Sequence, residues 1–284
     1  MSKRISKQRR ASLAAPLTTD NTCFYVKRRD GAEFGFTDAD VDITFLGVTY
    51  KAVTGYTPST VETKSDRSVD NMDVVAFLSD LSITEEDVRK GLWDFAEVEI
   101  FSIDRERPTD GIITLRYGWL GEIDVSGPTF KAEIRGIMQA LKQTLSRVYQ
   151  PLCRADLFDG QCKLSRAAWT DSGAVDSYSG DRLEVTDSSN GRPADYYTAG
   201  RLVWTGGANA GLAQEIRTHR SGGRFVLTLP PTFEVEPGDT FDVEAGCRKR
   251  LLEDCRDKFG NVKNFRGEPY LPGPDKVLDY PDAV

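Results

Sequence analysis

Four of the five cysteines fall into two spaced pairs, and their side chains are able to bind a metal. Eight residues separate Cys153 from Cys162, seven separate Cys247 from Cys255, and 84 lie between the pairs. Four thiolates can complete a tetrahedral zinc site or hold an iron–sulfur cluster. Nearby Arg and Lys residues favour the thiolate form. The spacing leaves three interpretations open: a metal or cluster site, two disulfides, or unlinked thiols.

The composition favours a folded protein of two domains. The chain has 284 residues, of which 39% are hydrophobic and 29% charged. Its net charge of −7 argues against general binding to nucleic acid, and no apolar run is long enough for a membrane helix. No apolar stretch follows the basic start MSKRISKQRR, so we expect synthesis in a reducing cytoplasm. Stable disulfides are rare there, which favours the metal or cluster interpretation.

Alternating apolar residues and frequent turn signals predict a mainly β fold, which is a β-rich α+β protein with a few short helices. Residues 41–45 and 48–52 alternate on either side of Gly47, as in a β-hairpin. Further strands are predicted at 95–103, 112–118, 119–125, 129–134, 195–205, 212–219, 224–229 and 240–245. The Ser-, Asp- and Gly-rich segment 170–193 is expected to be a long loop or a domain join.

Three helices are predicted from capping and periodicity. Thr84 precedes three acidic residues and is expected to cap a helix start. Apolar residues recur at helical spacing over 137–148. Leu251, Cys255 and Phe259 share another helical face that ends at Gly260, so Cys255 is expected to point inward.

These elements predict four segments along the chain. They are a flexible basic arm (1–19), an N-terminal β-rich domain (20–150), a C-terminal β-rich domain held by the four cysteines (151–274) and a C-terminal tail (275–284). Cys23 lies in an apolar strand and is expected to be a small core side chain outside the four-cysteine site.

Motifs for catalysis are not visible, so the sequence predicts a protein that is not an enzyme. His219 is the single histidine, and a Cys–His or Ser–His hydrolase would have to use it. It stands at the end of a predicted strand before a Gly-Gly turn, which favours an exposed position. The chain contains no nucleophile elbow, phosphate-binding loop or dinucleotide-binding motif.

Several stretches carry a resemblance to a known family. They are GFTDADVDITFLGVTYKA (35–52), VDNMDVVAFL (69–78), ITEEDVRKGLWDFAEVEIF (83–101), LGEIDVSGPTFKAEIRG (120–136), CRADLFDGQC (153–162), LVWTGGANAG (202–211) and GCRKRLLEDCRDKFGNVKNFRGEPYLPG (246–273). From about residue 20 to 274 the chain resembles the tail hub proteins of long-tailed phages and gene transfer agents. The cysteine-bearing region is similar, more distantly, to tail tip protein L of phage lambda.

The resemblance implies a structural protein of the virion tail tip or baseplate. Such hubs form a homotrimer ring that links the tail tube and the distal tail protein to the central tip or fibre protein, with the tape measure protein as a possible further partner. Carried over by motif, Cys153, Cys162, Cys247 and Cys255 would hold a structural [4Fe–4S] cluster, with zinc as the alternative. The basic first ten residues have no counterpart in the family.

A large trimer interface needs apolar surface, for which Tyr196, Tyr197, Trp204 and Phe233 are candidates, although core positions are favoured for each. Two other functions stay open. One is a tail-tip cysteine peptidase with His219 beside a thiol, and the other is a receptor- or carbohydrate-binding β module.

Overall fold

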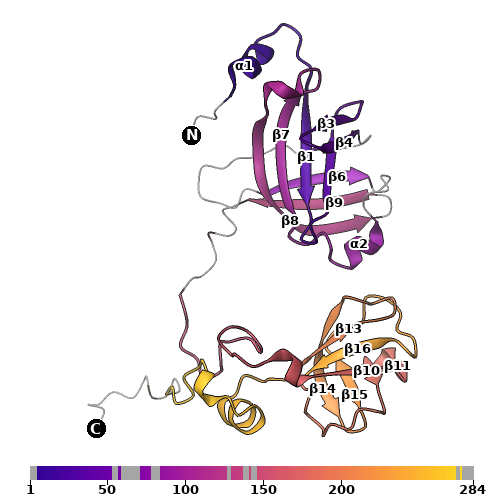
Figure 1. The fold of residues 1–284 in the computed structure, drawn as a ribbon, viewed down its shortest axis with the longest axis vertical. Helices are drawn as coiled ribbons and strands as arrows, with labels where there is room; N and C mark the ends of the chain where they lie inside the picture. Colours follow the sequence, from indigo (N-terminus) through magenta and orange to yellow (C-terminus); the bar gives the residue numbers. More distant parts are fainter. Residues whose placement is uncertain are drawn as a thin grey trace. The chain divides into compact units, whose positions relative to one another are not determined.

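The chain folds into two compact units. The computed structural model describes residues 5–52, 57–58, 71–77, 84–126, 129–136, 141, 146–272 and 276. The first unit is Met1–Leu145 and the second is Ser146–Val284 (Figure 1), where the sequence predicts a boundary between residues 150 and 151. In the part of the chain described, no helix has both the length and the apolar composition that crossing a membrane requires.

A nine-stranded sheet forms the first unit. Its strands are β1 (Asp20–Lys27), β2 (Glu33–Thr37), β3 (Ile43–Phe45), β4 (Val48–Ala52), β5 (Thr57–Pro58), β6 (Asn71–Phe77), β7 (Glu97–Asp104), β8 (Ile113–Ser126) and β9 (Thr129–Gly136). Their order is β3-β4-β2-β1-β7-β8-β9-β6-β5. The β2–β4 pair is parallel, and the other pairs are antiparallel.

Both faces of this sheet carry a hydrophobic core, because successive residues of a strand point to opposite faces. On β1, Phe24 packs in a cluster with Trp93 and Ile134, whereas Cys23 packs in another with Tyr50 and Ile103. Cys23 is therefore a buried core residue, as the sequence predicts. Burial raises the pKa of its thiol to about 11.

The predicted hairpin and the capped helix are both confirmed. β3 pairs with β4 around Leu46 and Gly47, which have φ of +50° and +85°, the combination that a tight hairpin turn requires. Helix α2 (Glu85–Arg89) begins at Thr84, whose hydroxyl accepts a hydrogen bond from the Asp87 backbone N–H at 3.1 Å.

Three predicted elements have other outcomes, and one of them is the strand predicted at 195–205, which is a strand only over Arg201–Trp204. Segments 112–118 and 119–125 form the single strand β8, so the predicted break between them is wrong. Gly118 lies in a close approach of two strands, where a Cβ atom would be 2.4 Å from the carbonyl oxygen of Arg135 on β9. Most of the helix predicted at 137–148 lies outside the described residues.

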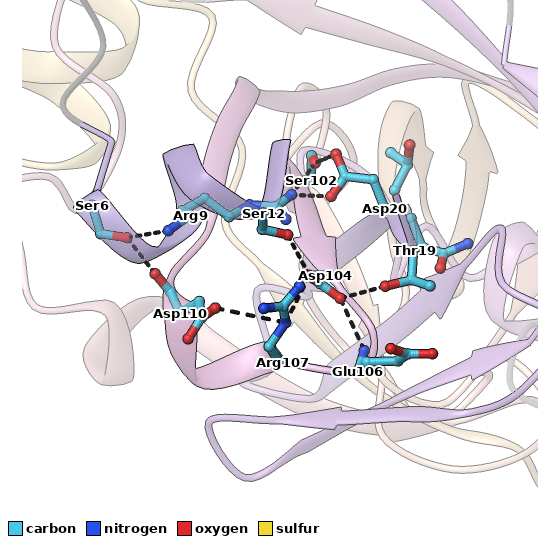
Figure 2. A network of polar contacts seen from close by, with 12 residues as sticks. Ser6, Arg9, Ser12, Thr19, Asp20, Ser102, Asp104, Glu106, Arg107 and Asp110 are labelled. Atoms are coloured by element: carbon cyan, nitrogen blue, oxygen red, sulfur yellow. Dashed lines mark hydrogen bonds and ion pairs between the residues drawn. The ribbon is translucent and has the colours of Figure 1, made fainter. Parts of the chain in front are cut away.

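The basic N-terminal segment contains helix α1 (Lys7–Leu13), where the sequence predicts a flexible arm over residues 1–19. Ser6 caps the helix by accepting a hydrogen bond from the Arg9 backbone N–H at 3.0 Å. Arg9 is 1% exposed and donates to Asp20 and, at 2.7 Å, to Ser102 (Figure 2). These partners belong to β1 and β7, so long-range contacts that composition does not reveal hold the helix against the sheet.

A seven-stranded antiparallel arrangement forms the second unit. Its strands are β10 (Thr170–Ala174), β11 (Ser177–Ser179), β12 (Glu184–Thr186), β13 (Arg201–Trp204), β14 (Ala213–Arg220), β15 (Arg224–Leu227) and β16 (Thr240–Glu244), in the order β10-β16-β13-β14-β15-β12-β11. The core contains Tyr197 and Trp204, two of the aromatic residues for which core positions were favoured.

The loop predicted at 170–193 is wrong, because this segment supplies β10, β11 and β12. Its small residues have packing roles. A Cβ atom on Gly173 would lie 3.0 Å from the ring of Phe241, and Val175 and Val185 are buried in the core. The strands are only three to five residues long, so apolar alternation is too brief to be recognised.

Short helices complete both units. They are η1 (Pro108–Asp110) in the first unit, and η2 (Arg166–Trp169), η3 (Gly180–Arg182), η4 (Leu251–Lys258) and η5 (Val262–Asn264) in the second. η4 is a π-helix, whereas the sequence predicts an ordinary helix over this segment.

Candidate four-cysteine site

The sheet of the second unit brings the two cysteine segments together. β10 and β16 are antiparallel neighbours, and Thr170 at the start of β10 pairs with Glu244 at the end of β16. The pairing extends outward, because the Ala245 backbone N–H donates to the carbonyl of Trp169 at 2.9 Å. The chain therefore enters β10 and leaves β16 at the same end of the sheet. Residues 153–162 and 247–255 lie just beyond these points.

All four predicted cysteines line one cavity in the second unit. Its wall contains Cys153, Cys162, Cys247 and Cys255 together with Ala155, Leu157, Leu164, Lys249, Arg250, Phe259, Asn261, Asn264 and Phe265. The four side chains are partly buried, and all five cysteines of the chain are free thiols. Apolar residues form much of the wall, so the thiols are shielded from water on several sides.

The first cysteine pair is held by backbone contacts and one turn. The Cys153 backbone N–H donates to the carbonyl of Lys249 at 2.8 Å, which joins the first cysteine segment to the second. Asp159 accepts hydrogen bonds from the backbone N–H groups of Cys162 at 2.6 Å and Gln161 at 2.8 Å. These bonds hold the pKa of the Asp159 carboxyl below its usual range, the Cys162 bond being the largest cause.

The second pair lies where β16 gives way to η4. The Cys247 backbone N–H donates to the carbonyl of Ala199 at 3.3 Å. Within η4, the Cys255 backbone N–H donates to the carbonyl of Arg250, five residues earlier, at 3.1 Å. Asp254 is buried and accepts a hydrogen bond from the Arg250 backbone N–H at 3.0 Å. The prediction that Cys255 faces inward is confirmed, since its side chain lines the cavity.

Two of the four sulfur atoms accept hydrogen bonds from N–H donors. The Arg266 backbone N–H donates to Cys153 Sγ at 3.3 Å, and Asn261 Nδ2 donates to Cys162 Sγ at 3.6 Å. Such donors stabilise negative charge on sulfur, so they suit thiolate ligands.

The thiols are electrostatically coupled to one another. Burial, followed by the neighbouring thiols of Cys153, Cys247 and Cys162, raises the pKa of Cys255 to about 11. Burial is also the main cause that raises the pKa of Cys247. Four thiolates in one cavity repel each other unless a positively charged group lies between them. The donor set therefore suits a cationic metal or cluster core.

The four thiol side chains do not converge on a single point. Within the ranges described, no three His, Cys, Asp or Glu side chains are placed as a group that could hold a metal ion. Four sulfurs about 2.3 Å from one zinc ion would lie within about 4 Å of each other. The four thiols instead surround a cavity, and an iron–sulfur cluster takes its Cys ligands at separate irons.

The exposed position predicted for His219 is wrong. Its side chain is 1% exposed, with ring centroids 4.9 Å from Tyr197 and 5.1 Å from Phe225, and burial lowers its pKa. The described wall of the cysteine cavity contains no histidine. The Cys–His arrangement that a cysteine peptidase needs is therefore not formed at this cavity.

Sequence reasoning missed the residues that organise the cavity, namely Asp159, Lys249, Asp254 and Asn261. The φ of +59° at Gly260 confirms the predicted end of the helix, and Asn261 is the residue that follows it. The remaining three are ordinary charged residues in the sequence, with no spacing signal that distinguishes them from surface residues.

Comparisons with known proteins establish the family. A family model described as "Baseplate hub protein, N-terminal attachment domain" matches residues 6–165, more than half of the chain. A second model, of a conserved hypothetical phage protein, matches residues 195–275. The chain belongs to the baseplate hub proteins, which confirms the resemblance seen in the sequence and the expected location in the virion baseplate.

A solved structure agrees with this assignment. A chain in the virion of a native gene transfer agent particle is 31% identical, with a TM-score of 0.81. The match covers 97% of this chain and 96% of that chain. No curated protein matches the sequence.

Proposed function

We propose that this protein is a non-enzymatic hub whose second unit is held together by a [4Fe–4S] cluster bound to Cys153, Cys162, Cys247 and Cys255. One observation carries the proposal: four thiols from two distant segments line one cavity. The resemblance to tail hubs favours the cluster over zinc. When bound, the cluster would supply positive charge and four Fe–S bonds, and the role assigned to it here is structural.

The fold gives a reason for such a crosslink. The segments that carry the thiols flank the whole sheet from β10 to β16, with 84 residues between the pairs. A crosslink over a loop of this length stabilises a fold by about 4 kcal/mol in the chain-entropy treatment of disulfides, used here by analogy. Short strands and few regular helices make the unit one that would benefit from it.

The direct test is analysis of iron, acid-labile sulfide and visible absorption in protein purified without oxygen. We expect four irons and four sulfides per chain. Single Cys→Ser changes at the four positions should abolish binding and lower the stability of the second unit. Cys23→Ser is the matched control and should leave iron content unchanged. Stoichiometric zinc without sulfide would reject the cluster and retain a thiolate site, and protein that binds neither metal would reject both.

We also propose that the hub assembles as a homotrimer ring that contacts the distal tail protein, the central tip or fibre protein and the tape measure protein. The likeness to a gene transfer agent virion chain over nearly the whole length supports an assembly role. Mass measurement of the purified protein at several concentrations tests the trimer. A monomer at all concentrations, together with a single copy in imaged particles, would contradict it.

A further inference from the structure

Asn261 joins the two cysteine segments through both its backbone and its side chain. Its backbone N–H donates to the carbonyl of Cys255 at 2.7 Å. Its Nδ2 donates to the carbonyl of Cys162 at 2.7 Å and to Cys162 Sγ at 3.6 Å. One residue therefore fixes the position of one cysteine from each pair.

The orientation of the Asn261 amide follows from the carbonyl of Cys162, which can only accept, so that the Nδ2 of Asn261 faces Cys162. Asn264 supports this orientation, because its Nδ2 donates to Asn261 Oδ1 at 2.7 Å. Asn261 is 5% exposed, so water does not compete for these contacts. Asn264 also lines the cavity, which ties the second asparagine to the same site.

The contact to sulfur distinguishes Asn261 from an ordinary structural asparagine. The donor to Cys153 is a backbone N–H group, whereas the donor to Cys162 is a side chain that a substitution can remove. Hydrogen bonds to ligand sulfurs help to set the reduction potential of an iron–sulfur cluster. Residues that orient metal ligands commonly change metal retention when they are replaced.

We propose that Asn261 is a positioning residue of the four-cysteine site. It holds Cys162 and Cys255 at their places around the cavity, and it donates an N–H to the sulfur of Cys162 that stabilises that sulfur as a ligand. The effect on a bound cluster rests on the proposed function, whereas the effect on Cys162 in the metal-free protein does not.

The test uses the full chain with Asn261→Asp, which keeps the shape of the side chain and removes both amide donors. In cluster-loaded protein we expect loss of iron to a chelator to be about 10-fold faster and the reduction potential to be more negative. In metal-free protein we expect alkylation of Cys162, followed by peptide mass spectrometry, to increase relative to Cys153, because Cys162 is no longer held in the cavity wall and becomes accessible to the reagent. Asn264→Ala should shift all three readouts in the same direction by a smaller amount, because it frees the Asn261 amide without touching sulfur.

Asn190→Asp is the matched control, since Asn190 Nδ2 donates to the hydroxyl of Tyr197 at 3.3 Å and not to a cysteine. Folded Asn261→Asp protein with wild-type iron retention, reduction potential and Cys162 alkylation would overturn the proposal. If wild-type protein binds no iron, the proposed function fails. The alkylation of Cys162 relative to Cys153 then decides the role of Asn261 by itself. A uniform rise in alkylation at all four cysteines would indicate unfolding of the site and would contradict a role specific to Cys162.

Discussion

Asp104 is the residue at which the attachment of helix α1 can be tested most sharply. Its side chain is 1% exposed and accepts hydrogen bonds from the hydroxyls of Ser12 and, at 2.6 Å, Thr19, and from the Glu106 backbone N–H at 3.1 Å (Figure 2). Burial alone would raise the pKa of this carboxyl, but these bonds and Arg107, at 3.6 Å, outweigh it. The pKa falls from 3.8 to about 2.

This shift has a calculable effect on stability. A carboxyl whose pKa falls by this amount on folding contributes about 2 kcal/mol at neutral pH. The contribution is complete well above the unfolded pKa of 3.8 and is lost as the pH falls through the folded pKa of about 2. About half of it should remain at pH 3. We therefore expect Asp104→Asn to lower the free energy of unfolding by about 2 kcal/mol at pH 7 and by about 1 kcal/mol at pH 3.

Urea denaturation at a series of pH values measures this difference. Asp40→Asn is the control, because Asp40 is 75% exposed and its ion pair with Arg105 should contribute less than about 1 kcal/mol. Hydrogen exchange adds a local readout, since α1 should lose protection in Asp104→Asn protein. A difference between wild type and Asp104→Asn that does not change between pH 7 and pH 3 would refute the assignment of the effect to an ionised Asp104.

Three further predictions follow from packing and hydrogen bonding. Ser12→Ala removes a donor to Asp104, so exchange in α1 should rise with little change in the second unit; unchanged protection would contradict the role of Ser12. Gly246→Ala would put a Cβ atom 1.8 Å from the carbonyl oxygen of Thr198, so thermal denaturation should show a loss of at least about 2 kcal/mol in the second unit. Gly180→Ala is the control and should be tolerated, because its Cβ would meet only one atom, at 4.0 Å. Phe241→Ala empties a fully buried core position and should lower the free energy of unfolding of the second unit by about 3–5 kcal/mol in urea denaturation. The transition of the first unit should be unchanged, and a common shift of both transitions would show that the units unfold together.

Much of the architecture was predictable because local signals agreed with the final fold. The hairpin around Gly47 and the cap at Thr84 depend on residues close in sequence, and both formed as expected. The cysteine spacing left a shared site, two disulfides and unlinked thiols open, and the antiparallel pairing of β10 with β16 explains why all four thiols line one cavity. The strand order itself had no local signal, since it depends on long-range pairing.

The errors have physical causes that a single sequence does not reveal. His219 was expected to be exposed because it stands at the end of a predicted strand before a Gly-Gly turn. Regular alternation from the buried Ile216 would also place it on the outer face. A register irregularity between Ile216 and Thr218 adds one residue, so His219 returns to the core. The contacts of Arg9 with Asp20 and Ser102 depend on distant residues, so a basic composition could not predict that Arg9 is buried.

The pairing of β10 with β16 also sets an order of events during synthesis. The ribosome makes Cys153 and Cys162 first, and 84 more residues must follow before Cys247 exists. The two segments become neighbours only after β16 has joined the sheet, because that pairing brings them to one end. A chain truncated before residue 246 would hold only two of the four thiols that line the cavity. Any group that needs all four thiols can enter only a finished unit, so its retention would mark subunits that are complete and ready for assembly.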